Sequence, residues 1–129
     1  METIIVNTKK QKEVVDITNM ISKIIKKNSF KEGVINLFLT HTTAALTTMD
    51  DDPGMDLDFF DALDIMIPKL KYRHPHNPAH TPSHILSSLI GTSLTLIVSG
   101  GELVLGTWQR VVLVELDGPK ERNILLSFK

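Results

Sequence analysis

The sequence predicts an α+β fold in which a largely antiparallel β-sheet forms the core of a single compact domain with about three helices. Short runs of apolar, β-branched residues recur along the chain, which is typical of strands. Between them lie three segments with apolar residues at helical spacing. Several connections are too short for a helical crossover, so a doubly wound parallel sheet is not expected.

Seven apolar runs are the predicted strands. They cover residues 3–6, 14–17, 34–39, 93–98, 103–105, 111–116 and 124–128. The first helix is expected between the second and third runs, at residues 19–27, because Met20, Ile21, Ile24 and Ile25 fall on one helical face.

The second helix is expected to begin after Asp52-Pro53 and to end at Pro68, since apolar residues recur there every three or four positions. The third helix is expected to have Thr81 as its N-cap and a proline as its first residue. Gly91 can end it.

Composition limits the classes of function. The chain has 129 residues, 42% of them hydrophobic, which suits one domain with a real core. Its net charge is -1 and no basic run is interleaved with aromatics, so no nucleic-acid partner is expected. No segment approaches the ~20 apolar residues of a membrane span, so we expect no membrane partner and a cytoplasmic, soluble protein. Because cysteine is absent, a metal would need imidazole and oxygen ligands.

Four of the five histidines lie between residues 74 and 84, and the fifth, His41, follows an apolar strand. Histidine is the commonest metal ligand and titrates near neutrality, so the cluster indicates a metal or proton-transfer pocket. Strand alternation would place His41 on the same face as Leu37 and Leu39, at a pocket floor. The alternative is a core histidine hydrogen-bonded to a carbonyl or hydroxyl. Prolines interrupt the segment around His76 and His80, which favours solvated loop residues at these two positions.

Helix geometry and charge add further candidates. His84 and Ser83 fall in the first turn of the third helix, where free backbone N–H groups favour a phosphate or carboxylate. Arg122 could clamp a phosphate through two hydrogen bonds or be an ordinary surface charge.

The acidic triplet at residues 50–52 lacks the spacing of a calcium loop, so a helix-capping loop is expected. Asp52 alone could face the site, because a residue before proline is held extended. Trp108 and Gln109 alternate across a strand, and Trp108 is expected to pack structurally rather than stack on a substrate.

A set of ordered motifs covers nearly the whole chain. They read HTTAAL at 41–46, DP at 52–53, YRH at 72–74, PSHILSS at 82–88, GTSL at 91–94, LGTWQ at 105–109 and DGPKER at 117–122. Together they resemble the YjbQ family, whose members carry the name secondary thiamine-phosphate synthase. The family usually has an Asn-Glu pair before the Asp-Pro element. This chain has Met49-Asp50-Asp51 there, and Asp50 keeps an acidic group.

The resemblance implies that residues 1–129 form one YjbQ-like domain, that the protein is a homotrimer, and that the site is built around His41, His74 and His84. These three histidines would suit a divalent metal, Zn²⁺ or Mg²⁺. The activity in the family name is a transferase reaction that couples a pyrimidine diphosphate to a thiazole phosphate.

The sequence therefore leaves three candidate functions. One is a transferase of the thiamine-phosphate synthase type for small phosphorylated metabolites, with phosphate groups at the third helix and Arg122 and a divalent ion near the histidines. Its candidate cofactor-binding residues are Ser83, Arg122 and Gln109. A second is a metal-dependent hydrolase of a small phosphorylated or acyl substrate, with the three histidines on the metal and Asp52 as the base. The third is a non-catalytic trimer that binds a small anionic metabolite.

Overall fold

The computed structural model describes all residues from 1 to 129 and confirms the α+β fold. Eight strands, three α-helices and one short 3-10 helix follow one another along the chain. In order they are β1 (Glu2–Asn7), β2 (Glu13–Asp16), α1 (Thr18–Lys27), β3 (Gly33–Leu39), β4 (Ala44–Asp50), α2 (Met55–Met66), η1 (Pro78–His80), α3 (Thr81–Ile90), β5 (Ser93–Ser99), β6 (Glu102–Leu103), β7 (Gln109–Glu115) and β8 (Glu121–Phe128).

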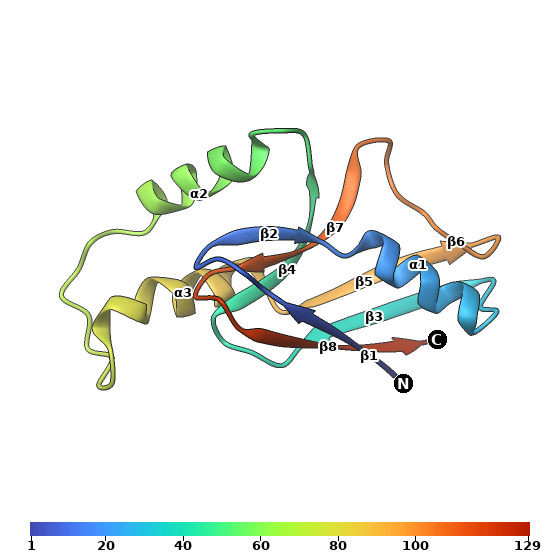
Figure 1. The fold of residues 1–129 in the computed structure, drawn as a ribbon, viewed down its shortest axis with the longest axis horizontal. Coiled ribbons are helices and arrows are strands. Elements are labelled where there is room, and N and C mark those ends of the chain that lie inside the picture. Colours follow the sequence, from blue (N-terminus) through green and yellow to red (C-terminus); the bar gives the residue numbers. More distant parts are fainter.

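The strands form two sheets in which every neighbouring pair is antiparallel. The larger sheet has the order β1-β8-β3-β5-β6 and the smaller one β2-β7-β4. Figure 1 shows α1 at one end of the molecule, with α2 and α3 at the other. The antiparallel core is thus confirmed, but it is divided between two sheets.

Two hydrophobic clusters hold these layers together. The first, of 16 buried residues, joins the inner faces of both sheets to Ile21 and Ile25 of α1. The second, of 7 residues, lies under α2 and α3 on the other face of the smaller sheet. Strand β7 serves both, since Leu113 belongs to the first cluster and Val112 to the second. Burial on both faces explains why β7 reads as a continuous apolar run.

The predicted helices are present, with differences at their ends. On the predicted face of α1, Ile21 and Ile25 are buried while Met20 is exposed. In α3, Thr81 is the first helical residue rather than the N-cap, and its buried hydroxyl has no hydrogen-bond partner. Gly91 ends this helix as expected. None of the helices has the length and apolarity needed to cross a bilayer.

Strand β4 was not among the predicted strands. It has the sequence AALTTMD, and alanine is depleted in strands, so the segment lacks a β-branched apolar run. It nevertheless pairs with β7 along its whole length, from Ala44 opposite Glu115 to Asp50 opposite Gln109. The candidate residues His41 and Asp52 lie beyond opposite ends of this strand.

A buried ion pair joins the two sheets at the end where β7 leads into β8. The Nε of Arg122 donates to Oε1 of Glu115 at 2.9 Å, and Arg122 is 1% exposed. The Thr8 hydroxyl also donates to Glu115, at 2.6 Å, and Arg122 donates to the carbonyl and hydroxyl of Thr43. Burial opposes ionisation of Glu115, but the hydrogen bonds from Arg122 and Thr8 outweigh it and hold the pKa of this carboxyl below 4.5.

Replacing Glu115 by Gln is expected to lower the free energy of unfolding by about 3–5 kcal/mol, because the Arg122 charge would stay buried without its partner. Urea denaturation measures this loss. Lys12→Ala is the matched control, since it removes the exposed pair between Lys12 and Asp64 and should cost less than about 1 kcal/mol. A loss from Glu115→Gln as small as that control would contradict the structural role of the pair.

Candidate functional site

A cavity of about 460 Å³ lies between the end of β3, the segment before β4 and the part of α3 from His84 onward. Only two of its ten lining residues are hydrophobic, and neither Lys nor Arg contributes to it. The lining residues are Phe38, Leu39, Thr40, His41, Thr42, His84, Ser87, Ser88, Gly91 and Thr92. The cavity therefore combines two of the predicted histidines with a set of hydroxyl groups.

Helix α3 is fixed against the smaller sheet by two serine hydroxyls. Ser87 donates to the carbonyl of Ala44 at 2.7 Å, and Ser83 donates to the carbonyl of Leu116 at 2.8 Å. His84 projects into the cavity from the turn between them. The Ser83 hydroxyl thus anchors the helix. Within α3, only residues from His84 onward line the cavity.

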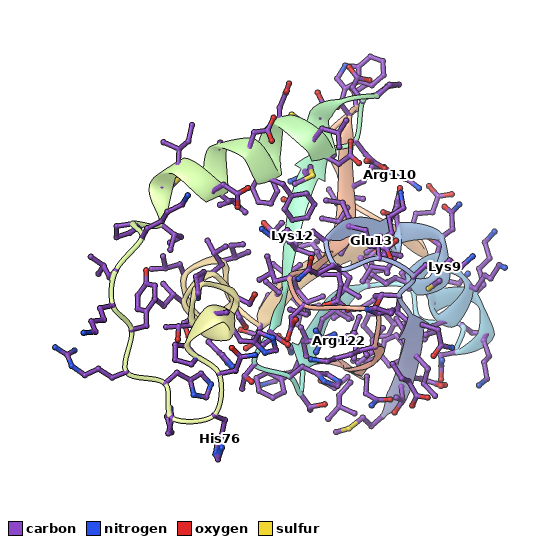
Figure 2. All side chains as sticks on the ribbon, turned by 60° about the vertical axis from the view of Figure 1, so that its left-hand side comes forward. Lys9, Lys12, Glu13, His76, Arg110 and Arg122 are labelled. Atoms are coloured by element: carbon purple, nitrogen blue, oxygen red, sulfur yellow. The ribbon has the colours of Figure 1, made fainter.

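His74 lies against His84, which lines the cavity, while His74 itself does not. Their Nε2 atoms lie 3.3 Å apart, and their ring centroids are 5.0 Å apart in an edge-to-face arrangement. The histidine cluster of the sequence therefore contains one pair with ring nitrogens in hydrogen-bond range, and the His76 ring lies farther off, with its centroid 6.1 Å from that of His74. His76 is exposed at the tip of the loop and points outward in Figure 2, while His80 lies 3.4 Å from Asp117.

His41 is held differently, because its Nε2 accepts a hydrogen bond from the backbone N–H of Asn123 at 2.9 Å. Its Nδ1 has no partner within the chain and is not sealed from solvent. Partial burial of the ring lowers the pKa of His41 below its ordinary 6.5, and the nearby Arg122 guanidinium adds to this effect. His41 is therefore a neutral side chain at neutral pH.

The predicted centre of His41, His74 and His84 is not assembled as a three-ligand set within this chain. No group of three or more His, Asp or Glu side chains is arranged to hold a metal. The physical reason is that the Nε2 lone pair of His41 is taken by a backbone donor, while the other two histidines face each other.

Two predicted residues lie far from the histidines. Asp52 and Gln109 sit at the end of the β4–β7 pair opposite His41, a strand length of about 20 Å away. Gln109 accepts from the N–H of Gly106 and donates to the Thr48 hydroxyl. Asp52 is exposed beside the other acidic residues of the triplet. Within one chain, Asp52 cannot act as a base on a substrate held near His41.

Arg122 and Trp108 also differ from expectation. Arg122 lies in the middle of the molecule, paired with Glu115, so it is neither a phosphate clamp nor a surface charge (Figure 2). Trp108 was expected to pack inside, yet it is 68% exposed in the turn before β7. A turn residue is not bound by strand alternation, which is why that argument was wrong for Trp108.

Some residues at the site were not identified from the sequence. Ser88 and Gly91 lie four and seven residues after His84, a spacing that puts them on the same helical face. That spacing was enough to identify both residues from the sequence. No sequence pattern pointed to the backbone of Asn123, because its N–H reaches His41 only through the pairing of β3 with β8.

This fold and site define a class of small antiparallel α+β proteins in which histidines line a cavity rich in hydroxyl groups. Residues 2–129 match the family model described as UPF0047 protein YjbQ-like, so the chain belongs to the YjbQ family. It is 37% identical over 123 residues to UPF0047 protein MJ1081 of Methanocaldococcus jannaschii, covering 95% of this chain and 88% of that one. UPF0047 protein YugU of Bacillus subtilis is 32% identical over 128 residues, with 98% and 97% covered.

Solved structures agree with the fold. A YjbQ/UPF0047 protein of Clostridium acetobutylicum superposes with a TM-score of 0.90 at 32% identity, covering 100% of both chains. A protein of unknown function from Sulfolobus solfataricus gives a TM-score of 0.90 at 32% identity, covering 98% of this chain and 94% of that one. None of these names states an activity.

Trp108→Ala is expected to change the free energy of unfolding by less than about 0.5 kcal/mol, because an exposed ring contributes little to the core. Urea denaturation measures this change. Leu113→Ala, in the buried strand β7, is the contrasting control and should cost about 2–5 kcal/mol. A comparable loss from Trp108→Ala would contradict the exposed position of the ring.

The lowered pKa of His41 makes stability depend on pH. Well above pH 6.5 the ring is neutral in both the folded and unfolded states, so its full contribution is present. As pH falls below 6.5 the unfolded chain takes up a proton before the folded one, and stability decreases until the lower pKa of the folded state is reached. NMR titration of the ring should give a midpoint below 6.5. A midpoint above 6.5 would contradict the described environment.

Proposed function

We propose that the chain is a zinc-dependent hydrolase of a small, uncharged acyl substrate such as an ester or amide. The observation that carries the proposal is the close His74–His84 pair, whose His84 lines a hydroxyl-bearing cavity without a Lys or Arg side chain. His74 and His84 are the proposed metal ligands, and the cavity is the proposed substrate site. A homotrimer and a cytoplasmic location remain predictions that accompany this function.

The spacing of the two histidines fits a zinc ion. Zinc binds imidazole nitrogen at about 2.0–2.1 Å, so two such nitrogens on a tetrahedral ion lie roughly 3.3–3.4 Å apart. The Nε2 atoms of His74 and His84 are 3.3 Å apart. Magnesium prefers oxygen ligands, which this pair does not offer. A zinc ion held here would polarise the oxygen of a bound carbonyl as a Lewis acid.

Two protein nitrogens leave coordination positions open. A catalytic zinc site usually has three protein ligands, so a further one is needed beyond those of a single chain. A neighbouring copy in the homotrimer that the family resemblance implies is the proposed source of that ligand. The open position that remains is the place for the substrate oxygen.

The surroundings of the cavity favour an uncharged ligand. The cavity runs along α3 from His84 to Gly91, and at the C-terminal end of this stretch the helix dipole is unfavourable for anions. Arg122, whose charge is close enough to His41 to lower the pKa of that ring, is already paired with Glu115. A hydrolase of acyl compounds therefore agrees with the geometry better than one of phosphorylated compounds.

The transferase that the family name suggests has less support. A diphosphate substrate needs cationic or helix N-terminal contacts, and here Ser83 anchors α3 while Arg122 is buried. Binding of a small anionic metabolite without turnover meets the same shortage of cations.

Zinc-reconstituted wild-type protein is expected to retain nearly one zinc ion per chain and to hydrolyse 4-nitrophenyl acetate. Elemental mass spectrometry of tag-free protein measures the metal. His74→Ala and His84→Ala should each lose both the zinc and the activity, because each removes one of the two proposed nitrogen ligands. His76→Ala is the matched control, since His76 is exposed on the same loop and should keep both.

Wild-type protein that takes up no zinc would overturn the proposal. Stabilisation by pyrophosphate with Mg²⁺, without zinc uptake, would favour the transferase instead.

A further inference from the structure

The partner of the His41 ring fixes its tautomer. Nε2 lies 2.9 Å from the backbone N–H of Asn123, and a backbone N–H can only donate. Nε2 must therefore carry the lone pair, so in the neutral ring the proton is on Nδ1. A ring that carried protons on both nitrogens would place two donors against each other at Nε2.

The Asn123 amide that fixes the ring is itself firmly held. Its neighbour Arg122 is buried in the ion pair with Glu115, and the same guanidinium donates to the carbonyl and hydroxyl of Thr43, two residues after His41. One buried cation thus connects the start of β8 to the segment that carries His41. Burial and this cation also lower the pKa of His41, which keeps the ring neutral.

The free nitrogen of His41 remains available to a ligand. His41 lines the cavity, and the hydrogen bonds of the chain leave Nδ1 without a partner. The only side-chain polar atom that is fully buried without a partner is the Thr81 hydroxyl, so solvent reaches Nδ1. A neutral imidazole with an exposed N–H is a hydrogen-bond donor and not a metal ligand at that atom.

We propose that His41 is a neutral hydrogen-bond donor that binds the acyl oxygen of the substrate through Nδ1–H, and that it is not a ligand of the metal. The identity of the ligand as an acyl compound rests on the proposed function. The tautomer of the ring and its place outside the metal site rest on the contacts of His41 alone. The role assigned to His41 thus differs from that of His74 and His84.

This donor acts where charge develops. In hydrolysis, the oxygen of water bonds to the acyl carbon and negative charge builds on the former carbonyl oxygen. The bond from carbon to the leaving alcohol or amine then breaks, and that group departs with one proton from water. A fixed N–H stabilises the charged oxygen without giving up its proton, and removing such a donor costs about 10²–10³ in kcat in comparable sites.

The first test is the ¹⁵N spectrum of the ring in metal-free protein near pH 7. We expect a protonated Nδ1 and an unprotonated Nε2 for His41, and a shift of Nδ1 on titration with acetamide as a carbonyl probe. The opposite tautomer, a doubly protonated ring, or a ring that acetamide leaves unmoved would each overturn the proposal.

The second test compares two variants after zinc reconstitution. Asparagine keeps an N–H donor at the position of Nδ1, whereas leucine has none, so His41→Asn and His41→Leu form a matched pair. Both should retain zinc. For 4-nitrophenyl acetate, His41→Leu should lower kcat by about 10²-fold or more with little change in KM, and His41→Asn should lower it less.

The outcomes separate this inference from the proposed function. Loss of zinc in His41→Leu, or an unchanged kcat, would overturn the donor role while leaving a zinc hydrolase in place. A wild type that neither binds zinc nor hydrolyses the ester would overturn the proposed function, and the spectrum of the metal-free ring would still decide the assignment of His41.

Discussion

The buried ion pair between Glu115 and Arg122 is the interaction on which the rest of the site depends. It lies where β7 of the smaller sheet leads into β8 of the larger one. Its other partners are Thr8, directly after β1, and Thr43, directly before β4. A charge removed from water must find partners for all its polar atoms. Satisfying these two charges fixes four chain segments relative to one another, including the one that carries His41.

This internal use of Arg122 also limits the chemistry of the cavity. A guanidinium that is committed to a carboxylate cannot bind a phosphate, and the cavity wall offers no other cation. Helix α3 adds to the restriction, because its serine anchors place the stretch from His84 to its C-terminal end, rather than its first three residues, beside the cavity. The hydroxyl groups and neutral imidazole that remain can form hydrogen bonds but contribute little net charge. Ligand recognition here must therefore depend on hydrogen-bond geometry.

Periodicity predicted much of the fold because it reports burial directly. The apolar face of α1 and the continuous apolar run of β7 both follow from which sides are covered. Strand β4 escaped prediction because its stability comes from pairing with β7 and not from its own composition. The histidines were found by residue type. Their roles, the burial of Arg122, the exposure of Trp108 and the distance to Asp52 depend on contacts between remote segments, which no local pattern records.

The three histidines show why residue type alone could not assign their roles. Each has the same two ring nitrogens, and what distinguishes them is the group that Nε2 faces. In His41 this group is a backbone donor, which takes up the lone pair that a metal would need. In His74 and His84 it is another imidazole, so these lone pairs can turn toward a shared ion. In the proposed hydrolase this difference lets one cavity hold a metal and a hydrogen-bond donor that do not compete for the same nitrogen.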